Sequence, residues 1–207
     1  MKNYNIFFIR HGITEGNLKG EYIGLTDLPL CEQGRETING YVKAGMYPSV
    51  DKVYTSPLKR CVQTARLIYP DYEPRRIDNL RECGIGEFEC KTIKQLAGLP
   101  EYTEWIKGGM DARAPGGESH GEFTLRCLDG LNEVFTDMTR SGTGTAAVIT
   151  HAGVIVNLLT GCGFPKGRPA DFAPEQGEGW LIGVSAYLWQ KGNVFEIIGK
   201  LTAQNPA

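Results

Sequence analysis

The chain has 207 residues, enough to bury one substantial hydrophobic core, and no linker-like stretch divides it. Its 22 Lys and Arg stand against 24 Asp and Glu, for a formal net charge of -2, so it lacks the general cationic field that gathers nucleic acid or an anionic membrane surface. We therefore expect a single domain over residues 1–207, no nucleic-acid or membrane partner, and a local origin for any anion site.

The cysteines and the N-terminus indicate where the protein resides. The six cysteines are scattered and form no CxxC pair. The N-terminus lacks the basic, long apolar and small-residue order of a signal peptide, and no window approaches the roughly 18 uninterrupted apolar residues of a membrane-spanning helix. These observations predict reduced thiols and a cytoplasmic location.

Short apolar, β-branched runs alternate with segments of helical period along most of the chain, which is typical of an α/β protein. We expect a three-layer α/β/α sandwich, in which helices cover both faces of a mostly parallel sheet. The expected strands are Asn5 to Arg10, Lys52 to Thr55, Arg76 to Leu80, Ala146 to Thr150, Ser185 to Gln190 and Val194 to Lys200. The last two are joined by Lys191 and Gly192, which predicts a terminal hairpin and therefore a mixed sheet.

Four helices are expected among these strands. They are Glu32 to Ala44, Pro57 to Tyr69, Ser119 to about Arg140, and Gly153 to Thr160. Ser56 is a suitable N-cap for the second, and Pro70 ends it. Ser119 and Glu122 form the S-x-x-E capping box of the third. The fourth is apolar nearly all round, so it should be buried against the sheet.

Reactive side chains follow four of the expected strands, at the edge where open α/β sheets bind ligands. Arg10 and His11 end the first, and Arg60 lies one turn into the helix after the second. Glu82 follows the third and His151 follows the fourth. We expect these two imidazoles, two guanidiniums and one carboxylate to meet in one crevice.

These residue types suit phosphoryl transfer. Guanidiniums bind phosphate oxygens bidentately, so Arg10 and Arg60 would hold a phosphoryl group. A neutral imidazole is a nucleophile towards phosphorus, and Gly12 lets a backbone carbonyl accept from one ring nitrogen of His11 and free the other. Glu82 is the candidate carboxyl to protonate the leaving alkoxide and later take a proton from water.

Ordinary structural explanations compete with these assignments. Arg60 on a helix surface is more often solvated or salt-bridged, and by its sequence alone Glu82 is no better a catalytic acid than Glu87 or Glu89. His120 lies inside the expected capping box, which favours a structural role or a place at the rim of the site.

The chain carries an ordered set of motifs: FFIRHGITEGN, YIGLTDLPLCEQGR, SPLKRCVQTA, LRECGIGEFE, PGGES and ITHAGV. Together they resemble the histidine phosphatase superfamily in its phosphoglycerate mutase-like branch, over residues 4 to about 156. The compact chain and the PGGES segment also resemble the α-ribazole phosphatases within that family. The ordered set is far more specific than Arg-His-Gly alone.

The resemblance implies a role for each matched position. His11 would be the nucleophile that becomes phosphohistidine, Glu82 the proton donor, and Arg10, Arg60 and His151 the phosphate ligands. Asn17, the Gly24 backbone and Ala152 would lie in the substrate-binding part of the site. Neither a metal nor an organic cofactor is implied.

The chain also departs from the family pattern at three positions. Cys31 stands where many members have a helix-capping Thr, Cys90 replaces a frequent Gly, and Ala152 replaces another. None of these changes removes a catalytic group.

The leading hypothesis is a phosphatase that hydrolyses a small phosphomonoester through phosphohistidine. A mutase would use the same residues but must hold a second phosphate, and a non-catalytic phospholigand-binding protein is the alternative from another class. We expect the irregular excursion at 101–117, with Tyr102, Trp105, Ile106 and Met110, to form a lid that sets specificity. The only partners expected are a small phosphorylated substrate and a second copy of the chain in a homodimer.

Overall fold

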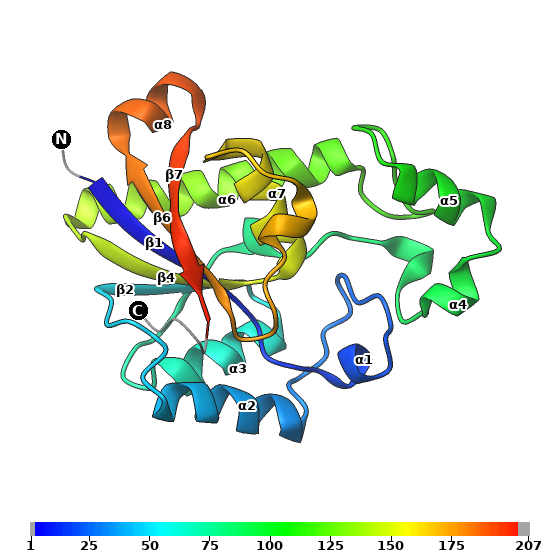
Figure 1. The fold of residues 1–207 in the computed structure, drawn as a ribbon, viewed down its shortest axis with the longest axis horizontal. Coiled ribbons are helices and arrows are strands. Elements are labelled where there is room, and N and C mark those ends of the chain that lie inside the picture. The colour runs from blue at the N-terminus through cyan, green and yellow to red at the C-terminus, as the bar shows by residue number, and fades with distance from the viewer. Residues whose placement is uncertain (1–2, 203–207) are drawn as a thin grey trace.

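The computed structural model describes residues 3–202, and within them a seven-stranded mixed sheet forms the middle layer (Figure 1). The strands are β1 (Asn3–Arg10), β2 (Lys52–Thr55), β3 (Arg75–Arg76), β4 (Thr145–Thr150), β5 (Gly163–Phe164), β6 (Gly179–Ser185) and β7 (Phe195–Leu201). Their order is β3-β2-β4-β1-β6-β7-β5. Strands β1 to β4 run parallel, whereas β6 pairs antiparallel with both β1 and β7.

The helices connect these strands. They are α1 (Glu15–Leu18), α2 (Glu32–Lys43), α3 (Lys59–Ile68), α4 (Ile93–Leu96), α5 (Pro100–Lys107), α6 (His120–Ser141), α7 (Ala152–Cys162) and α8 (Ala186–Gly192). Three 3₁₀ turns accompany them: Asp78–Leu80, Gly86–Phe88 and Pro169–Phe172. No helix within residues 3–202 is both long and apolar enough to cross a membrane.

The side chains of β1 divide between two hydrophobic cores, because successive residues of a strand point to opposite faces. Phe7 and Ile9 pack in the core that contains residues of α2 and α3. Ile6 and Phe8 pack in the core that contains residues of α6 and α7. The helices on both sides of the sheet confirm the predicted three-layer α/β/α sandwich.

Helix α6 has the termini that its sequence predicts. The Ser119 hydroxyl accepts from the Glu122 N–H, and the Glu122 carboxylate accepts from the Ser119 N–H. The helix ends at Gly142, whose φ of 70° places it in the left-handed region that suits a helix C-terminus. The capping box is therefore confirmed, and it fixes where this 22-residue helix begins.

The predicted strand from Arg76 to Leu80 is wrong over most of its length. Only Arg75 and Arg76 pair with β2, and a 3₁₀ turn follows from Asp78. Ile77 and Leu80 are both fully buried. Three residues apart, they match the 3₁₀ period of three rather than the period of two that a strand requires.

The predicted terminal hairpin of Ser185 to Gln190 with Val194 to Lys200 is also wrong. The antiparallel pair is β6 with β7, and the predicted first strand is mostly α8, which ends at Asn193 with a φ of 52°. Trp189 explains the helix: it is buried, it packs on Phe135 and Phe195, and its Nε1–H donates to Asn132 Oδ1 at 2.6 Å. The mixed character of the sheet is nevertheless confirmed.

Two helix starts differ from prediction. Helix α3 begins at Lys59 with Leu58 as N-cap, so Ser56 is not its N-cap residue. Helix α7 runs from Ala152 to Cys162, one residue earlier and two later than expected. Both predicted helices otherwise lie in their expected places, as does α2.

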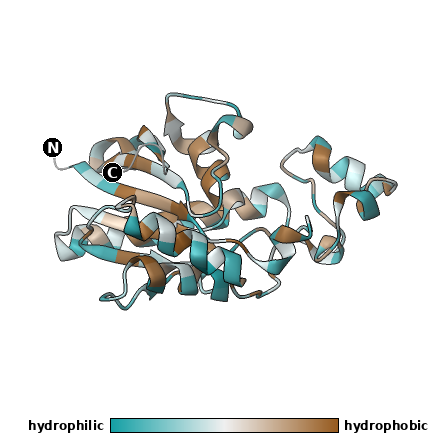
Figure 2. Ribbon diagram, turned by 60° about the horizontal axis from the view of Figure 1, so that its bottom comes forward, coloured by the Kyte–Doolittle hydropathy of each residue, from teal (hydrophilic) through white to brown (hydrophobic). Residues whose placement is uncertain are grey.

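Residues 85–117 form a small lobe that carries α4 and α5 and lies apart from the sheet in both views (Figures 1 and 2). It has its own hydrophobic cluster of Ile85, Phe88, Leu96, Tyr102 and Ala114. The expectation of an irregular segment at 101–117 is wrong in part, since α5 fills its first half with Pro100 at the N-terminus and Lys107 in the last turn. That the lobe moves as a lid stays a prediction.

Cys90 occupies a backbone conformation that favours glycine, with a φ of 58°. We expect Cys90→Gly to raise the free energy of unfolding by about 1 kcal/mol, because a side chain in the left-handed region costs about that much. Urea unfolding of both proteins would measure it. Cys31→Gly is the matched control: Cys31 has a φ of -77° and is buried, so its replacement should destabilise. A destabilised Cys90→Gly variant would contradict the argument.

Candidate active site

The predicted catalytic residues meet where β1, α3 and α7 come together. His11, Arg60 and His151 are almost fully buried, with exposures of 6%, 1% and 0%. The two imidazole centroids lie 5.3 Å apart, with the rings inclined at 65°. Glu82 joins them, because its carboxylate accepts from the Gly153 N–H at the start of α7. The predicted convergence is therefore present in the structure.

The His11 ring is held in one tautomer. Its Nδ1 lies 2.7 Å from the Gly12 carbonyl oxygen. A carbonyl can only accept, so Nδ1 carries the proton and, in the neutral ring, Nε2 keeps a free lone pair. The Gly12 N–H in turn donates to Thr64 Oγ1, which fixes this turn against α3.

His11 is neutral at physiological pH. Burial lowers its pKa well below the usual value, and the neighbouring Arg60 and Arg10 guanidiniums lower it further, against the opposing effect of the Gly12 hydrogen bond. Its Nε2 is therefore available as a nucleophile without any base to deprotonate it.

Arg60 is a buried cation without a carboxylate partner. Its Nη1 donates to the Thr26 carbonyl at 2.8 Å and its Nη2 to the Gly24 carbonyl at 2.7 Å, while the buried Nε–H has no acceptor. Among residues 3–202, no carboxylate lies within 4.0 Å of this guanidinium. A buried, unpaired charge is unfavourable unless a counter-ion arrives, so the site is suited to an anion.

Arg10 has the same character at the end of β1. Its Nη1 donates to the Pro174 carbonyl at 2.8 Å, and its Nε–H is buried without an acceptor. Burial lowers its pKa, Glu82 and Glu175 oppose that shift, and a guanidinium remains charged at any working pH. The two unsatisfied N–H groups and two positive charges together favour an oxyanion such as phosphate.

Glu82 is a half-buried carboxyl at the same site. Burial raises its pKa, while the backbone N–H groups of Cys83 and Gly153 and the charges of Arg60 and Arg10 oppose that rise. A side chain at Gly153 would displace the Glu82 carboxylate, because a Cβ there would lie 2.3 Å from Glu82 Oε1. The raised pKa favours a group that can both give and take a proton near neutral pH.

His151 is the N-cap residue of α7 and is oriented by Ser56. Its Nε2 lies 2.8 Å from Ser56 Oγ and 3.5 Å from Cys61 Sγ. Burial lowers its pKa well below the usual value, helped by the charge of Arg60. Burial also raises the pKa of Cys61 to about 12, so this thiol is protonated beside the ring.

The three predicted substrate-binding positions differ in their location and contacts. The Gly24 carbonyl holds Arg60, and Ala152 is the first residue of α7, next to His151. Asn17 lies in α1, where its Oδ1 accepts from the Thr14 N–H and hydroxyl in a capping box. These two hydrogen bonds support the turn after His11, and contact of Asn17 with a substrate stays a prediction.

The comparisons with known proteins agree with this geometry. The family model of the histidine phosphatase superfamily (branch 1) matches residues 6–178. The chain belongs to the histidine phosphatase superfamily. It is 28% identical over 169 residues to the 2,3-bisphosphoglycerate-dependent phosphoglycerate mutase of Rhizobium etli, covering 75% of this chain and 78% of that protein.

Two further relatives lie on the phosphatase side of the family. The adenosylcobalamin/alpha-ribazole phosphatase of Salmonella typhimurium is 28% identical over 185 residues, covering 83% of this chain and 86% of that protein. The crystal structure of the alpha-ribazole phosphatase from Shigella flexneri superposes with a TM-score of 0.77 at 23% identity, covering 96% of each chain. The latter likeness supports the phosphoglycerate mutase-like fold.

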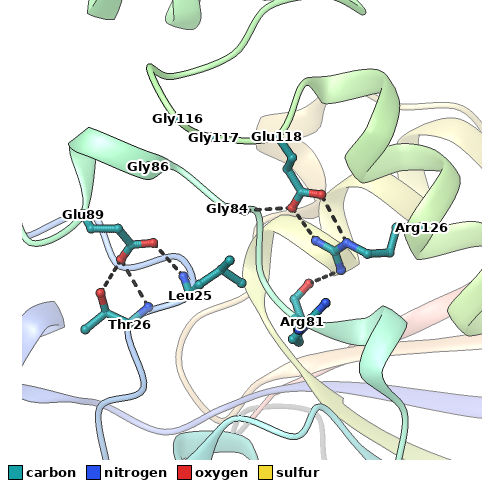
Figure 3. A pocket seen from close by; sticks show the side chains of 10 residues that line it. All are labelled: Leu25, Thr26, Arg81, Gly84, Gly86, Glu89, Gly116, Gly117, Glu118 and Arg126. Atoms are coloured by element: carbon teal, nitrogen blue, oxygen red, sulfur yellow. Dashed lines mark hydrogen bonds and ion pairs between the residues drawn. The ribbon is translucent and has the colours of Figure 1, made fainter.

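This member of the superfamily holds its site with carboxylates and an arginine that the sequence analysis did not identify as supports. Glu89 accepts from the N–H groups of Gly24, Leu25 and Thr26, and so fixes the loop whose carbonyls hold Arg60. Figure 3 shows the bonds from Leu25 and Thr26. The two competing candidate acids have other positions: Glu89 supports this loop, and Glu87 is exposed.

A second support fixes the segment that carries Glu82. Arg126 of α6 donates to the carbonyls of Asn79, Arg81 and Glu82 at 2.9 to 3.1 Å, and it forms an ion pair with Glu118. Figure 3 shows its contacts with Arg81 and Glu118. Glu118 Oε1 also accepts from the Gly84 N–H at 2.7 Å. One guanidinium therefore ties α6, the PGGES loop and the segment with the catalytic candidate together.

Replacing Arg126 should lower the turnover number without lowering the affinity for the substrate. We expect Arg126→Gln to lower kcat by about 10²-fold and to change KM much less, because a shift of about 1 Å in a catalytic group has that effect. Arg126→Lys should recover only part of the rate, since an ammonium lacks the planar fork. Steady-state kinetics would measure both. Arg75→Gln, at an exposed ion pair, is the control. If Arg126→Gln instead raised KM by about 10²-fold and left kcat unchanged, a positioning role for Arg126 would be contradicted.

The buried histidines predict a pH-dependent stability. The pKa values of His11 and His151 are lower in the folded than in the unfolded protein. The unfolded chain therefore binds more protons below pH 6.5, and stability is lost as pH falls through that value, by up to about 1.4 kcal/mol per pH unit for each histidine. Glu82 has the opposite sign, which leaves a net loss.

The pH dependence would be measured by urea unfolding at pH 7.5 and 5.5. His151→Gln removes one of the two titrating rings, so its free energy of unfolding should fall less than that of the wild type between these values. Equal pH dependence in the two proteins would show that His151 is not the neutral, buried ring described above.

Proposed function

We propose that this histidine phosphatase superfamily member is a phosphatase that hydrolyses a small phosphomonoester through a phosphohistidine on His11. One observation carries the proposal. The Arg10 and Arg60 guanidiniums, each with a buried Nε–H that has no acceptor, lie beside a neutral His11 with a free Nε2. An electrophilic phosphoryl group would neutralise both charges and meet the nucleophile.

The first half-reaction transfers the phosphoryl group to His11. Nε2 donates its electron pair to phosphorus and forms the N–P bond, while the bond from phosphorus to the ester oxygen breaks. Glu82 gives its proton to that oxygen, so the alcohol leaves neutral. Arg10, Arg60 and His151 stabilise the phosphoryl oxygens through the transition state.

The second half-reaction returns the protein to its starting state. Glu82, now ionised, takes a proton from water as the water oxygen attacks phosphorus. The N–P bond breaks, its electrons return to His11 Nε2, and inorganic phosphate leaves. No step needs a metal ion, which agrees with the resemblance. Among residues 3–202 there is no group of three or more His, Cys, Asp or Glu side chains placed to hold one.

Of two cavities beside the site, the larger favours hydrolysis over mutase chemistry, which must hold a second phosphate. Its volume is about 490 Å³, and its described lining, which includes Gly153, has no Lys, Arg, Asp or Glu, so that His120 is the one lining residue that can carry a positive charge. The other, of about 320 Å³, contains Arg81 and Arg126, but Glu89 and Glu118 line it too (Figure 3). Arg126 pairs with Glu118 there, whereas Arg81 forms no ion pair within residues 3–202 and its Nε–H is buried without an acceptor, so only the larger cavity supports transfer to water.

Other expectations stay proposals. His11 and Glu82 are both in place, which favours catalysis over the non-catalytic phospholigand-binding alternative. A small phosphorylated substrate is the proposed partner, the cytoplasm is the proposed location, and a homodimer stays a prediction that light scattering would test.

Phosphate release in the presence of a chelator tests the proposal. The panel should contain p-nitrophenyl phosphate, sugar phosphates, α-ribazole phosphate and 3-phosphoglycerate. We expect turnover of at least one ester that chelator does not affect. Interconversion of 3- and 2-phosphoglycerate faster than phosphate release would favour the mutase, and binding of phosphate without any turnover would favour the non-catalytic alternative.

A further inference from the structure

An apolar cavity of about 490 Å³ lies between the small lobe and helices α6 and α7. Trp105 and Met110 line it from the lobe, Phe123 lines it from α6, and Val156 and Thr160 line it from α7. Binding sites for small organic molecules have this size and a mainly apolar lining. The cavity is therefore large enough for a ligand.

The cavity adjoins the proposed proton donor. Cys83 and Gly153 belong to its lining, and their N–H groups donate to the two Glu82 carboxylate oxygens at 2.9 and 3.1 Å. A phosphoryl group at His11 has its ester oxygen beside Glu82 in the proposed reaction. Whatever is bonded to that oxygen would extend towards this cavity.

The lining sets the chemistry of that group. None of the described lining residues is Lys, Arg, Asp or Glu, and His120 is the one that can carry a positive charge, so a second anion would lose its hydration without gaining a permanent counter-ion. Aromatic and branched side chains instead favour a flat apolar group. The volume is about three times the roughly 150 Å³ that holds a benzene ring, which leaves room for fused rings.

Two polar atoms of the lining residues lack partners. Trp105 Nε1 and Thr160 Oγ1 are buried and have no hydrogen-bond partner. Buried polar groups are nearly always paired, so both atoms are suited to a ligand. By contrast, Asn157 in the same wall already donates to Thr124 Oγ1 at 2.9 Å. An indole N–H is a donor only, so its partner must be an acceptor.

We propose that this cavity binds the leaving group of the substrate, and that the substrates are phosphomonoesters of uncharged, ring-bearing alcohols with a hydrogen-bond acceptor on the ring. The inference rests on the proposed phosphatase activity, whose leaving alcohol it identifies by class. It also gives the small lobe a role, because Trp105 and Met110 make it one wall of the specificity pocket.

The first experiment compares kcat/KM for 2-naphthyl phosphate and phenyl phosphate, esters of two phenols with similar acidity. We expect the naphthyl ester to be better by about tenfold, from the burial of its second ring. Val156→Phe narrows the cavity and should bring the ratio closer to one. Ile106→Ala is the control on the lobe, since Ile106 is 58% exposed and lies outside the lining. A wild-type ratio near one would overturn the proposal.

The second experiment tests the acceptor. Quinolin-6-yl and quinolin-7-yl phosphates place a ring nitrogen at two different positions on the naphthyl frame. We expect the better of them to exceed 2-naphthyl phosphate by about fivefold, and Trp105→Phe to remove that advantage, as for the loss of one hydrogen bond. If neither quinolinyl phosphate exceeds 2-naphthyl phosphate in kcat/KM, or if the Trp105→Phe variant keeps that advantage, the proposed hydrogen-bond acceptor on the ring is wrong.

Calorimetry separates this inference from the proposed activity. The probes are 2-naphthylmethylphosphonate and methylphosphonate, which cannot be hydrolysed, and the first should bind about tenfold more tightly. If no ester is hydrolysed but this preference is present and lost in Val156→Phe, the pocket stands and the phosphatase activity is wrong. If esters are hydrolysed and neither naphthyl compound is preferred, the activity stands and the pocket is wrong.

Discussion

Replacing His11 with alanine is expected to lower kcat/KM by about 10⁴-fold or more for every phosphomonoester, as removal of a covalent nucleophile does. The structure gives the reason, because His11 is the buried, neutral imidazole between Arg10 and Arg60. Neither guanidinium can replace it as a nucleophile. Phosphate release from p-nitrophenyl phosphate would measure the loss.

The His11→Ala variant should also fail to form a phosphoenzyme. Phosphohistidine survives in alkali, so a rapid alkaline quench of protein mixed with labelled substrate would detect it in the wild type alone. Thermal unfolding would check that the variant remains folded. Labelling of the variant at the wild-type level would show that another residue is the nucleophile.

Replacing Glu82 with glutamine is expected to lower kcat by about 10²- to 10⁴-fold for an alkyl phosphate, the range for loss of a general acid and base. The loss should be smaller for p-nitrophenyl phosphate, whose leaving group needs little protonation. Comparison of the two esters therefore tests protonation rather than folding. Glu87→Gln is the matched control, since Glu87 is exposed on the same segment.

The same residue predicts the pH profile. Burial raises the pKa of Glu82, and the first half-reaction needs its protonated form, so kcat/KM for an alkyl phosphate should fall as pH rises through that raised pKa. In Glu82→Gln this basic limb should disappear. An unchanged basic limb in the variant would assign the proton donor to another group.

The sequence predicted the middle of the fold better than its ends. Strands β1 and β4 were predicted because they are buried on both faces and read as continuous apolar runs. The segment from Ser185 to Gln190 has aromatic residues that suit a strand or a helix. Only the packing of Trp189 against Phe135 decides for the helix, and that contact joins residues more than fifty positions apart.

The site was predicted to the extent that chain order carries it. Arg10, His11 and His151 lie at the ends of two expected strands, and Arg60 follows another by about one helical turn, so the topology of the sheet was enough to gather these four. Glu82 was expected after a strand that is mostly a 3₁₀ turn, and Arg126 holds its backbone in place. Arg126 and Glu89 were missed as supports because their partners are backbone groups of distant segments. The capping box just before Arg126 was the nearest available signal.

The unpaired Arg60 guanidinium has a consequence for how this protein works in a cell. Because its charge is buried without a carboxylate, the empty site favours any small oxyanion that fits. In the proposed reaction the last such oxyanion to leave is inorganic phosphate itself. We therefore expect product inhibition. The guanidinium that binds the substrate also binds the product, so the rate should fall as the phosphate concentration around the protein rises.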